Sequence, residues 1–375
     1  MSEWKEYKLG DIAIMKNGKK RPNNKGIYPV YGGNGIMDYC NDYNSEATII
    51  VGRVGAYCGC VYLCKSKCWV TDNAISVSAK DSVDLEYLFY AMKTLDFHRM
   101  RIGGAQPLMT QDIIGGFDIR LPNIPEQREI VSIIKSLDDK IENNRKINEN
   151  LEQQAQALFK SWFIDFEPFK DGKFIDSELG PIPQGWRVGT LDEICCFISR
   201  GISPKYDETT EEFVLGQTCV RNNIVTLNNA RKHRPKVKNE KWTKQWDVLI
   251  NSTGVGSLGR VGIVYFDKAN VAFDSHLTVV RTKDDITRLY VGRNLLNRQL
   301  EIENMAVGST GQTELPRDSV KSMPIIIPTH FVIKKFNELI KPMALQMYHL
   351  INENISLSQT RDTVLPKLMS GEIKV

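Results

Sequence analysis

The chain contains the same order of segments twice, and this repeat constrains its fold more than any single motif. Trp4 to Ile12 (WKEYKLGDI) aligns with Trp186 to Ile194 (WRVGTLDEI), with the Trp, Leu and Ile residues in register. Thr71 to Val77 aligns in the same way with Phe273 to Val279. A repeat of this length within 375 residues predicts two globular regions of one type rather than a single large domain.

The distance between the two copies changes along the chain. It is 182 positions at the tryptophans, 202 at the Thr71 segment and 206 from Gln106 and Gln312 onward, where it stays constant. The second copy therefore carries insertions within its globular part. The segments that follow the two globular parts are equivalent in length.

The globular parts are predicted to mix strands and helices. Short runs rich in β-branched and aromatic residues, such as ATIIVG (47–52) and DVLINS (247–252), are separated by glycines, as expected for strands joined by tight turns. The segment 84–102 has helical spacing instead. The fold class is therefore α+β, with two tandem α/β globular regions.

A long helix is predicted after each globular part, because apolar residues alternate at spacings of four and three, the pattern of a coiled-coil seam. Asn148 and Asn354 occupy equivalent positions in the two seams, where asparagine costs stability but fixes the register. The seam of the first helix includes Ile130, Ile134, Leu137, Ile141, Asn148, Leu151 and Leu158, and that of the second includes Phe336, Ile340, Met343, Met347, Leu350, Asn354 and Leu357.

A single helix of this kind could pack only on its own globular region, but two matched seams favour pairing with each other. A helix of about 36 residues is about 54 Å long, which is more than one small domain can cover. We therefore expect an antiparallel coiled coil. The predicted segments are a first globular domain (1–122), a first helix (123–163), a connector (164–185), a second globular domain (186–328), and a second helix with its tail (329–375).

Composition excludes several classes of protein. Hydrophobic residues at 42% and charged residues at 25% are typical of globular chains, and the sequence has neither an apolar run of membrane length nor a start like a signal peptide. We expect a cytoplasmic protein without a membrane partner. Cys58, Cys60, Cys64 and Cys68 form a cluster without paired CxxC spacing or a nearby histidine, so reduced thiols are favoured over a metal site.

The net charge of +4 is too small to indicate a nucleic-acid partner, but two local segments are strongly basic. Residues 16–25 contain five basic residues and no acidic one, and residues 231–246 contain seven Lys or Arg, one Glu, and the aromatic residues Trp242 and Trp246. Either segment alone could be a solvated surface. Because both repeats carry one, we predict that they bind DNA.

The repeat also allows the two candidate surfaces to be compared. The segment 199–205 (SRGISPK) is equivalent to 16–21 (KNGKKR), and it keeps the glycine while most of the surrounding side chains differ. The two copies should therefore read different base sequences. The candidate DNA-binding residues are Lys16, Lys19, Lys20, Arg21, Asn23, Arg53, Gln106, Arg200, Lys205, Arg231, Arg234, Lys236, Arg260 and Gln312.

The candidates for catalysis are weak. Ser275 and His276 are neighbours that a strand would point to opposite faces, and the segment 308–313 lacks the GK[ST] ending of a phosphate loop. Asp165 and Glu167 have no third ligand for a metal. We therefore expect no catalytic residue and no bound metal or cofactor in this chain.

Several segments together resemble a known family. They are EQREIVSIIKSLDDKIENN (126–144), ALFKSWFIDFEPF (157–169), GPIPQGW (180–186) and LPKLMSGEI (365–373). With the tandem order of globular region and helix, the chain resembles the specificity subunit of type I restriction-modification enzymes over essentially its whole length. Phe331 to Ile333 depart from the pattern that Pro125 to Gln127 set at the start of the first helix.

The resemblance implies two target-recognition domains that read the two halves of an asymmetric, bipartite site in double-stranded DNA. The two helices would form an antiparallel coiled coil that acts as a ruler. Two methyltransferase subunits and the motor-nuclease subunits would be the protein partners, and S-adenosylmethionine, ATP and Mg would be bound by them. Two alternatives remain open: a self-contained DNA methyltransferase or nuclease, and a coiled-coil adaptor that binds only protein.

Overall fold

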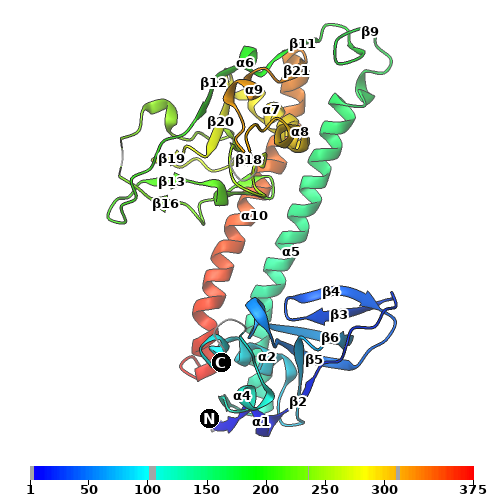
Figure 1. Cartoon of the computed structure of the whole chain (residues 1–375), viewed down its shortest axis with the longest axis vertical. Helices are drawn as coiled ribbons and strands as arrows, with labels where there is room; N and C mark the ends of the chain where they lie inside the picture. Colours follow the sequence, from blue (N-terminus) through cyan, green and yellow to red (C-terminus); the bar gives the residue numbers. More distant parts are fainter. Residues whose placement is uncertain (1–3, 101–106, 235, 310–312) are drawn as a thin grey trace. The chain divides into compact units, whose positions relative to one another are not determined.

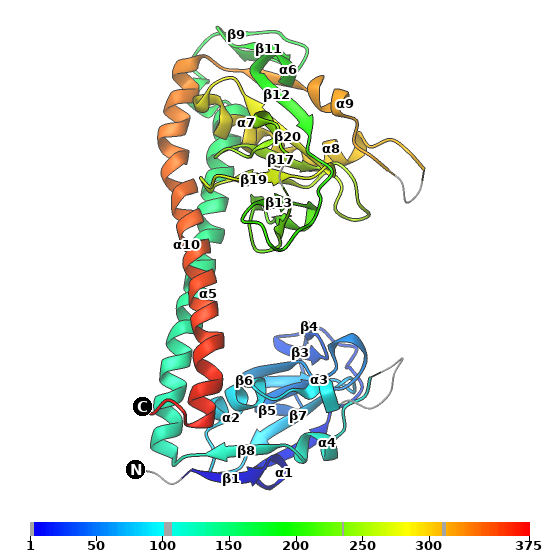
Figure 2. The same cartoon turned by 90° about the vertical axis from the view of Figure 1, so that its left-hand side faces the viewer.

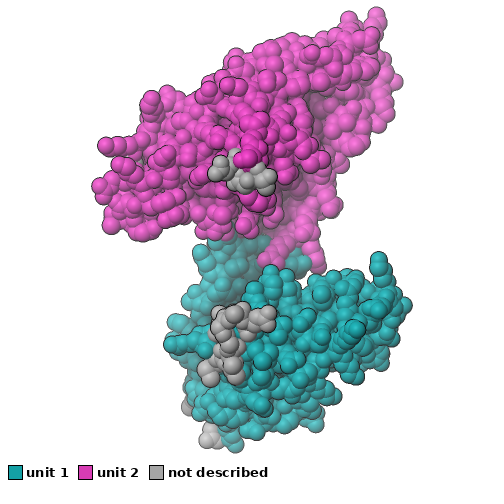
Figure 3. Space-filling model, in the orientation of Figure 1, with its two compact units in different colours: residues 1–143, 353–375 teal, residues 144–352 magenta. Residues whose placement is uncertain are grey.

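The computed structural model describes residues 4–100, 107–234, 236–309 and 313–375. The chain divides into two compact units, coloured separately in Figure 3. Unit 1 consists of residues 1–143 and 353–375, and unit 2 consists of residues 144–352. Each unit therefore contains one globular region together with parts of both long helices, a division that the five predicted segments did not anticipate.

The globular region of unit 1 is built on a six-stranded sheet with the order β2-β7-β5-β6-β3-β4. Neighbouring strands are antiparallel except for β3 and β6. The β-branched residues Ile49, Ile50 and Val51 of the central strand β5 are completely buried, as their sequence pattern predicts. The strands are β2 (Ala13–Asn17), β3 (Tyr28–Gly32), β4 (Gly35–Cys40), β5 (Ser45–Gly52), β6 (Val61–Val70) and β7 (Ala74–Ala79).

Short helices and a second pair of strands connect this sheet to the first long helix. Asp84 caps α2 by accepting hydrogen bonds from the backbone N–H groups of Glu86 and Tyr87, which fixes where this helix begins. The remaining elements are β1 (Lys5–Lys8), which pairs antiparallel with β8 (Asp118–Leu121), and α1 (Leu9–Ile12), α2 (Leu85–Lys93), α3 (Phe97–Met100), α4 (Gln111–Gly115) and the 3-10 turn η1 (Gly55–Tyr57).

The globular region of unit 2 repeats this plan and extends it. A six-stranded sheet has the order β12-β20-β17-β18-β15-β14, and a separate three-stranded sheet has the order β16-β13-β19. The three-stranded sheet draws β13 and β16 from the part of the second copy that is longer than its equivalent. The strands are β12 (Cys195–Arg200), β13 (Phe213–Leu215), β14 (Val220–Arg221), β15 (Ile224–Val225), β16 (Arg231–Lys232), β17 (Val248–Asn251), β18 (Val261–Val264), β19 (Val271–Phe273) and β20 (Leu277–Thr282).

Unit 2 also contains the connector between the repeats, several short helices and a further pair of strands. The connector between the repeats is ordered and contains a short antiparallel pair of strands, β9 and β10. The elements are η2 (Glu167–Phe169), β9 (Phe174–Ile175), β10 (Ile182–Pro183), β11 (Arg187–Thr190), α6 (Leu191–Ile194), η3 (Gln217–Cys219), η4 (Asn239–Lys241), α7 (Asp285–Asn297), α8 (Gln299–Asn304), α9 (Arg317–Lys321) and β21 (Pro324–Ile327), which pairs with β11.

The two long helices are α5 (Ile124–Phe163) and α10 (His330–Ser370), and they pair antiparallel within each unit (Figures 1 and 2). In unit 1, Asn354 donates a hydrogen bond from Nδ2 to the backbone oxygen of Ile141 at 3.2 Å. In unit 2, the Phe336 ring lies 4.8 Å from the Phe163 ring and 6.1 Å from the Phe159 ring. The predicted α+β fold with an antiparallel helix pair is therefore confirmed.

The residues of the two predicted seams are all buried or half-buried, whereas Ile133 and Leu339 on the outer faces are 40% and 46% exposed. The equivalent asparagines differ in their contacts. Asn354 bonds to the facing helix, while in the described part of the chain nothing donates to the buried side-chain oxygen of Asn148. None of the described helices is long and apolar enough to cross a membrane.

An aromatic cluster joins the helix pair of unit 2 to its globular region. The Phe163 ring lies 4.7 Å from the Tyr290 ring and 5.8 Å from the Trp186 ring, and Trp186 also packs against Phe169 at 5.0 Å. Phe166, just past the end of α5, has a positive φ of 54°, which turns the chain into the connector. The end of one long helix is thus held by the beginning of the second repeat.

We predict that Phe163→Ala destabilises the protein by about 3–5 kcal/mol, because it opens a cavity in this buried cluster. Urea unfolding followed by tryptophan fluorescence measures the change. Ile164→Ala is the matched control, because the Ile164 side chain is 51% exposed and should contribute less than about 1 kcal/mol. Equal losses in the two variants would contradict the assignment of Phe163 to the core.

Candidate nucleic-acid interface

The two repeats anchor equivalent loops in the same way. In unit 1, the backbone N–H of Gly18 donates to the Ala74 oxygen at 3.0 Å, and that of Lys19 donates to the Val70 oxygen at 3.0 Å. In unit 2, Gly201 and Ile202 donate to Leu277 and Phe273 at 3.1 and 2.9 Å. Each loop therefore begins on the turn that leads into the next buried strand.

The glycine that both loops share has a steric reason. A Cβ atom at Gly18 would lie 1.9 Å from the backbone oxygen of Thr71, and one at Gly201 would lie 1.9 Å from that of Phe273. Only glycine allows this close approach of two backbone segments. The repeats thus keep the residue that positions the loop and change the side chains that follow it.

In unit 1, the loop after Gly18 presents basic side chains to solvent. Lys16, Lys19, Lys20 and Asn23 are exposed, and Arg21 forms an ion pair with Asp38 of β4. The backbone of Arg53 bonds to Asn73, so Arg53 lies beside the same turn as Lys19. The structure therefore places Lys19 and Arg53 beside residues 70–73, and Lys16 lies on β2 opposite Ser76 of β7.

In unit 2, the loop after Gly201 meets the basic segment that contains β16. The backbone N–H of Arg234 donates to the Lys205 oxygen at 2.8 Å, which holds the two segments together. They enclose a cavity of about 380 Å³, to which Lys205, Arg234 and Lys236 contribute three cations and Asp207 one carboxylate. The cavity is lined by Ile202, Ser203, Lys205, Tyr206, Asp207, His233, Arg234 and Lys236.

The basic side chains beside this cavity are held in defined positions. The Arg231 guanidinium lies 3.3 Å from the centre of the Tyr206 ring, which leaves its N–H groups directed sideways. Nε and Nη2 of Arg234 both donate to the Asp207 carboxylate, at 3.1 and 2.8 Å. Hydrogen bonds from Thr209 and Arg234 lower the pKa of the Asp207 carboxyl to about 2, so this pair stays charged at neutral pH.

The candidate residues predicted from the sequence did not include five residues of this cavity: Ile202, Ser203, Tyr206, Asp207 and His233. The side chain of His233 is completely buried, and within the described residues neither ring nitrogen has a hydrogen-bond partner. Aromatic residues near basic ones indicate a nucleic-acid surface, and this signal could have identified Tyr206. It was applied to Trp242 and Trp246 instead, but Trp246 is buried in the core of unit 2 and Trp242 is half-buried.

Other predicted residues lie elsewhere. The Arg200 side chain donates to the Leu315 oxygen at 2.7 Å and pairs with Glu314 at 2.6 Å, and the Arg260 side chain donates to the Gly256 oxygen at 2.7 Å. These guanidinium groups therefore hold backbone segments of unit 2. Gln106 and Gln312 lie outside the described residues.

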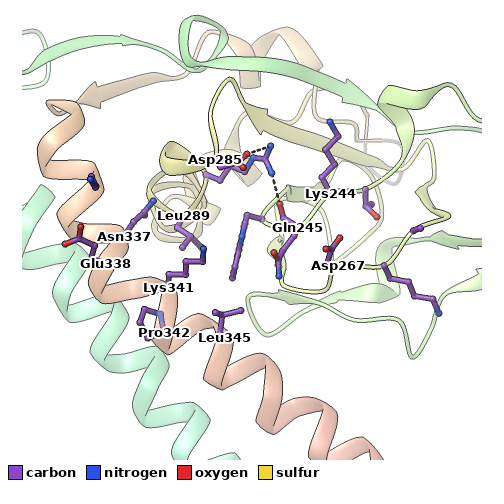
Figure 4. A pocket seen from close by; sticks show the side chains of 16 residues that line it. Lys244, Gln245, Asp267, Asp285, Leu289, Asn337, Glu338, Lys341, Pro342 and Leu345 are labelled. Atoms are coloured by element: carbon purple, nitrogen blue, oxygen red, sulfur yellow. Dashed lines mark hydrogen bonds and ion pairs between the residues drawn. The ribbon is translucent and has the colours of Figure 1, made fainter.

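A larger cavity of about 890 Å³ lies in unit 2 between the globular region and α10 (Figure 4). Its charges are mixed, because Lys244, Lys341 and other cations alternate with Asp267 and Glu338. Arg288 at its wall is already paired with Asp285 at 2.7 Å. The lining side chains give both cavities a net formal charge of +2, from five cations and three carboxylates in the larger and from three cations and one carboxylate in the smaller. The smaller cavity concentrates this charge in less than half the volume and therefore suits a phosphate better.

The groups considered for catalysis or metal binding have local structural partners. Nδ1 of His276 lies 2.8 Å from the Thr253 hydroxyl, and Cys64 donates to the Ser66 oxygen at 3.4 Å. A hydrogen bond from the neighbouring Cys68 lowers the pKa of the Cys64 thiol. Within the described residues, no three His, Cys, Asp or Glu side chains gather in a way that could hold a metal ion.

Comparisons with known proteins agree with this architecture of paired helices and loop-bearing domains. Residues 1–153 match the family described as the type I restriction modification DNA specificity domain. The MjaIX specificity subunit of a type I restriction enzyme from Methanocaldococcus jannaschii is 29% identical over 334 residues, covering 84% of this chain and 76% of that protein. The HindI specificity subunit from Haemophilus influenzae is 23% identical and covers 77% of each.

A solved structure shares the fold. The S subunit of a type I restriction-modification system from M. genitalium superposes with a TM-score of 0.68 at 18% identity, covering 98% of this chain and 96% of that one. The resemblance predicted from the sequence is confirmed: residues 1–153 match the type I restriction modification DNA specificity domain, and type I restriction enzyme specificity subunits are similar to most of the chain.

We predict that Gly18→Ala lowers the free energy of unfolding by about 1–3 kcal/mol, because the added methyl group collides with the Thr71 backbone. The amide of Lys19 should also exchange its hydrogen faster, since its bond to Val70 is displaced. Gly10→Ala is the control, because its Cβ would meet only ordinary contacts, at 3.5 Å from Gly115. Unchanged exchange at Lys19 would rule out the proposed anchor.

Proposed function

We propose that this chain reads a bipartite, asymmetric site in double-stranded DNA, with one half of the site read by each globular region. The observation that carries the proposal is the pair of glycine-anchored loops. Gly18 and Gly201 hold the loops at the same place in the two repeats, while Lys19 and Lys20 in one correspond to Ile202 and Ser203 in the other. Two loops that occupy equivalent positions but carry different side chains are suited to recognising two different base sequences.

In the second reader, the cavity of unit 2 supplies the contact to the DNA backbone. Lys205, Arg234 and Lys236 bring three cations to one small concave site, and this suits a phosphate. Arg231, stacked on Tyr206, is positioned to donate two hydrogen bonds to a base edge, as arginine does with guanine in the major groove. Lys16, Lys19, Lys20 and Arg53 serve unit 1 in the same way.

We further propose that the chain itself is not catalytic and works in the cytoplasm as a scaffold. Two methyltransferase subunits, one for each repeat, and the motor-nuclease subunits would carry the chemistry, with S-adenosylmethionine, ATP and Mg bound on them. The competing functions are a self-contained DNA methyltransferase or nuclease and an adaptor that binds only protein. Methyl transfer or cleavage by the purified chain would favour the first, and equal affinity for all duplexes would favour the second.

The triple variant Lys205→Ala, Arg234→Ala, Lys236→Ala should weaken binding of the assembled complex to its target and reduce the slope of log K against log salt by about 2–3, because up to three phosphate contacts are lost. Fluorescence anisotropy at several salt concentrations measures both quantities. Lys160→Ala, Lys170→Ala, Lys173→Ala removes the same charge on the end of α5 and the connector and should leave the slope unchanged. An unaltered slope in the first variant would remove the cavity from the interface.

The paired helices are proposed to set the gap between the two half-sites. Inserting one heptad within 142–153 of α5 and one at the equivalent place in α10 adds about 10 Å, or about three base pairs of B-DNA. Sequencing of methylated sites in cells that carry the lengthened chain should reveal the same two half-sites with a longer gap. An unchanged gap would argue against a ruler and leave the assignment of the reading loops untouched.

A further inference from the structure

An ion pair lies in the helix seam of unit 1. Nη1 of Arg361 on α10 donates to Oδ1 of Asp138 on α5 at 2.8 Å, and the hydroxyl of Tyr90 on α2 donates to the other carboxylate oxygen at 2.8 Å. The Asp138 and Arg361 side chains are only 28% and 24% exposed. Both carboxylate oxygens are thus satisfied in a site that is largely removed from water.

A second ion pair links α5 to the globular region of unit 2. Nη1 of Arg293 on α7 donates to Oε2 of Glu152 at 2.7 Å, and Nδ2 of Asn223 donates to Oε1 at 3.0 Å. Arg293 is 2% exposed, and its Nη2 lies 3.3 Å from the Tyr265 hydroxyl. Again a carboxylate receives one guanidinium and one neutral donor.

The signs of these charges follow the repeats. The first repeat (residues 1–163) supplies both carboxylates, Asp138 and Glu152, and the second repeat (residues 186–375) supplies both guanidinium groups, Arg293 and Arg361. The internal repeat places a different residue at each equivalent position. With the constant separation of 206, the equivalents of Asp138, Glu152 and Arg361 are Ala344, Ser358 and Ala155.

The equivalent of Arg293 follows from matched tyrosines. The hydroxyls of Tyr87 and Tyr290 donate to the backbone oxygens of Arg120 and Ile326, which are themselves 206 positions apart. Because Arg293 lies three residues after Tyr290, its equivalent is Tyr90, three residues after Tyr87. Neither ion pair therefore has a charged counterpart in the other unit. Where unit 1 has Asp138 and Arg361, unit 2 has the fully buried Ala344 and Ala155.

We propose that these two ion pairs select the pairing of unlike repeats and exclude the pairing of a repeat with a second copy of itself. If two first repeats paired, Asp138 would face Ala155 and Glu152 would face Tyr90. If two second repeats paired, Arg361 would face Ala344 and Arg293 would face Ser358. Pairing of two first repeats leaves Asp138 and Glu152 without their guanidinium partners. Pairing of two second repeats leaves Arg293 without Glu152 and leaves Arg361 only its neighbour Asp362, whose side chain is 65% exposed.

The physical reason is the asymmetry between keeping and breaking a buried ion pair. A complete pair contributes little beyond what apolar residues would provide, but removal of one partner leaves an uncompensated charge and is strongly destabilising. Discrimination therefore arises from the penalty on the wrong partner. A third pair, Lys140 with Glu353 at 3.5 Å, has the opposite sign order, but its side chains are 47% and 32% exposed and it should contribute little.

Alanine substitutions at one pair provide the first test, and unit 2 provides the precedent. Asp138→Ala and Arg361→Ala should each lower the urea midpoint of the full chain, because the first leaves Arg361 only the 65% exposed Asp362 and the second leaves Asp138 without a guanidinium. The double variant should recover most of the loss, since it reproduces the Ala155 and Ala344 arrangement. If the double variant loses as much as the two single variants together, the pair does not act by charge complementarity.

Two oppositely charged full-length chains test the selection directly. The first carries Asp138→Arg and Glu152→Arg, so all four ion-pair positions are cations, and the second carries Arg293→Glu and Arg361→Glu, so all four are anions. Neither should form a stable monomer. When produced together with different affinity tags, they should co-purify as a 1:1 assembly with the mass of two chains by light scattering, because each repeat then finds an opposite charge on the other chain.

A chain with all four substitutions is the control for folding, because it restores both ion pairs with reversed sign and should be a stable monomer. The proposal is overturned if the all-cation chain is a monomer with the wild-type urea midpoint. It is also overturned if neither the mixture nor the fourfold variant restores folded protein, since the positions would then require their own residues rather than opposite charges. DNA binding enters neither readout, so the outcome is independent of the proposed function.

Discussion

The antiparallel packing of α5 against α10 is the interaction on which the rest of the structure depends. Each compact unit contains the first half of one long helix and the second half of the other, so neither globular region completes its core from its own repeat. In unit 1, Leu365 and Leu368 of α10 pack with Ile130 and Ile134 of α5 beneath the sheet. The burial of apolar surface that stabilises each unit is therefore shared between distant parts of the chain.

The candidate DNA interface also follows from the repeat. The two copies share the backbone geometry at the start of the loop, but they differ in the side chains that follow. Gly18 and Gly201 allow two backbone segments to approach so closely that any larger residue would displace the loop. The side chains beyond the glycine are free to vary because they do not contribute to the core. This separation between a fixed anchor and variable contacts is what a protein needs to read different sequences from one fold.

Charge serves two purposes in this chain. At the loops, Lys205, Arg234 and Lys236 are exposed and line one cavity, which is the proposed contact with the DNA backbone. Arg361 in the helix seam of unit 1 and Arg293 on α7 of unit 2 are instead largely buried and paired with carboxylates of the other repeat. A count of basic residues does not distinguish these purposes, because burial decides them: Arg234 also has a carboxylate partner, Asp207, but its side chain is 70% exposed, whereas Arg293 is 2% exposed.

The sequence by itself determined the two repeats, the two long helices and the register of their seams, because heptad spacing and a constant separation are local properties of the chain. It also located the glycine loops and the basic segments. Only the tertiary structure decided that Trp246 belongs to the core, that Arg200 and Arg260 hold backbone segments, and that Tyr206, Asp207 and His233 join the cavity. Those outcomes depend on which distant segments come into contact, and the residue pattern within a single strand or helix does not determine such contacts. The helix seams could be predicted because their spacing repeats within each helix.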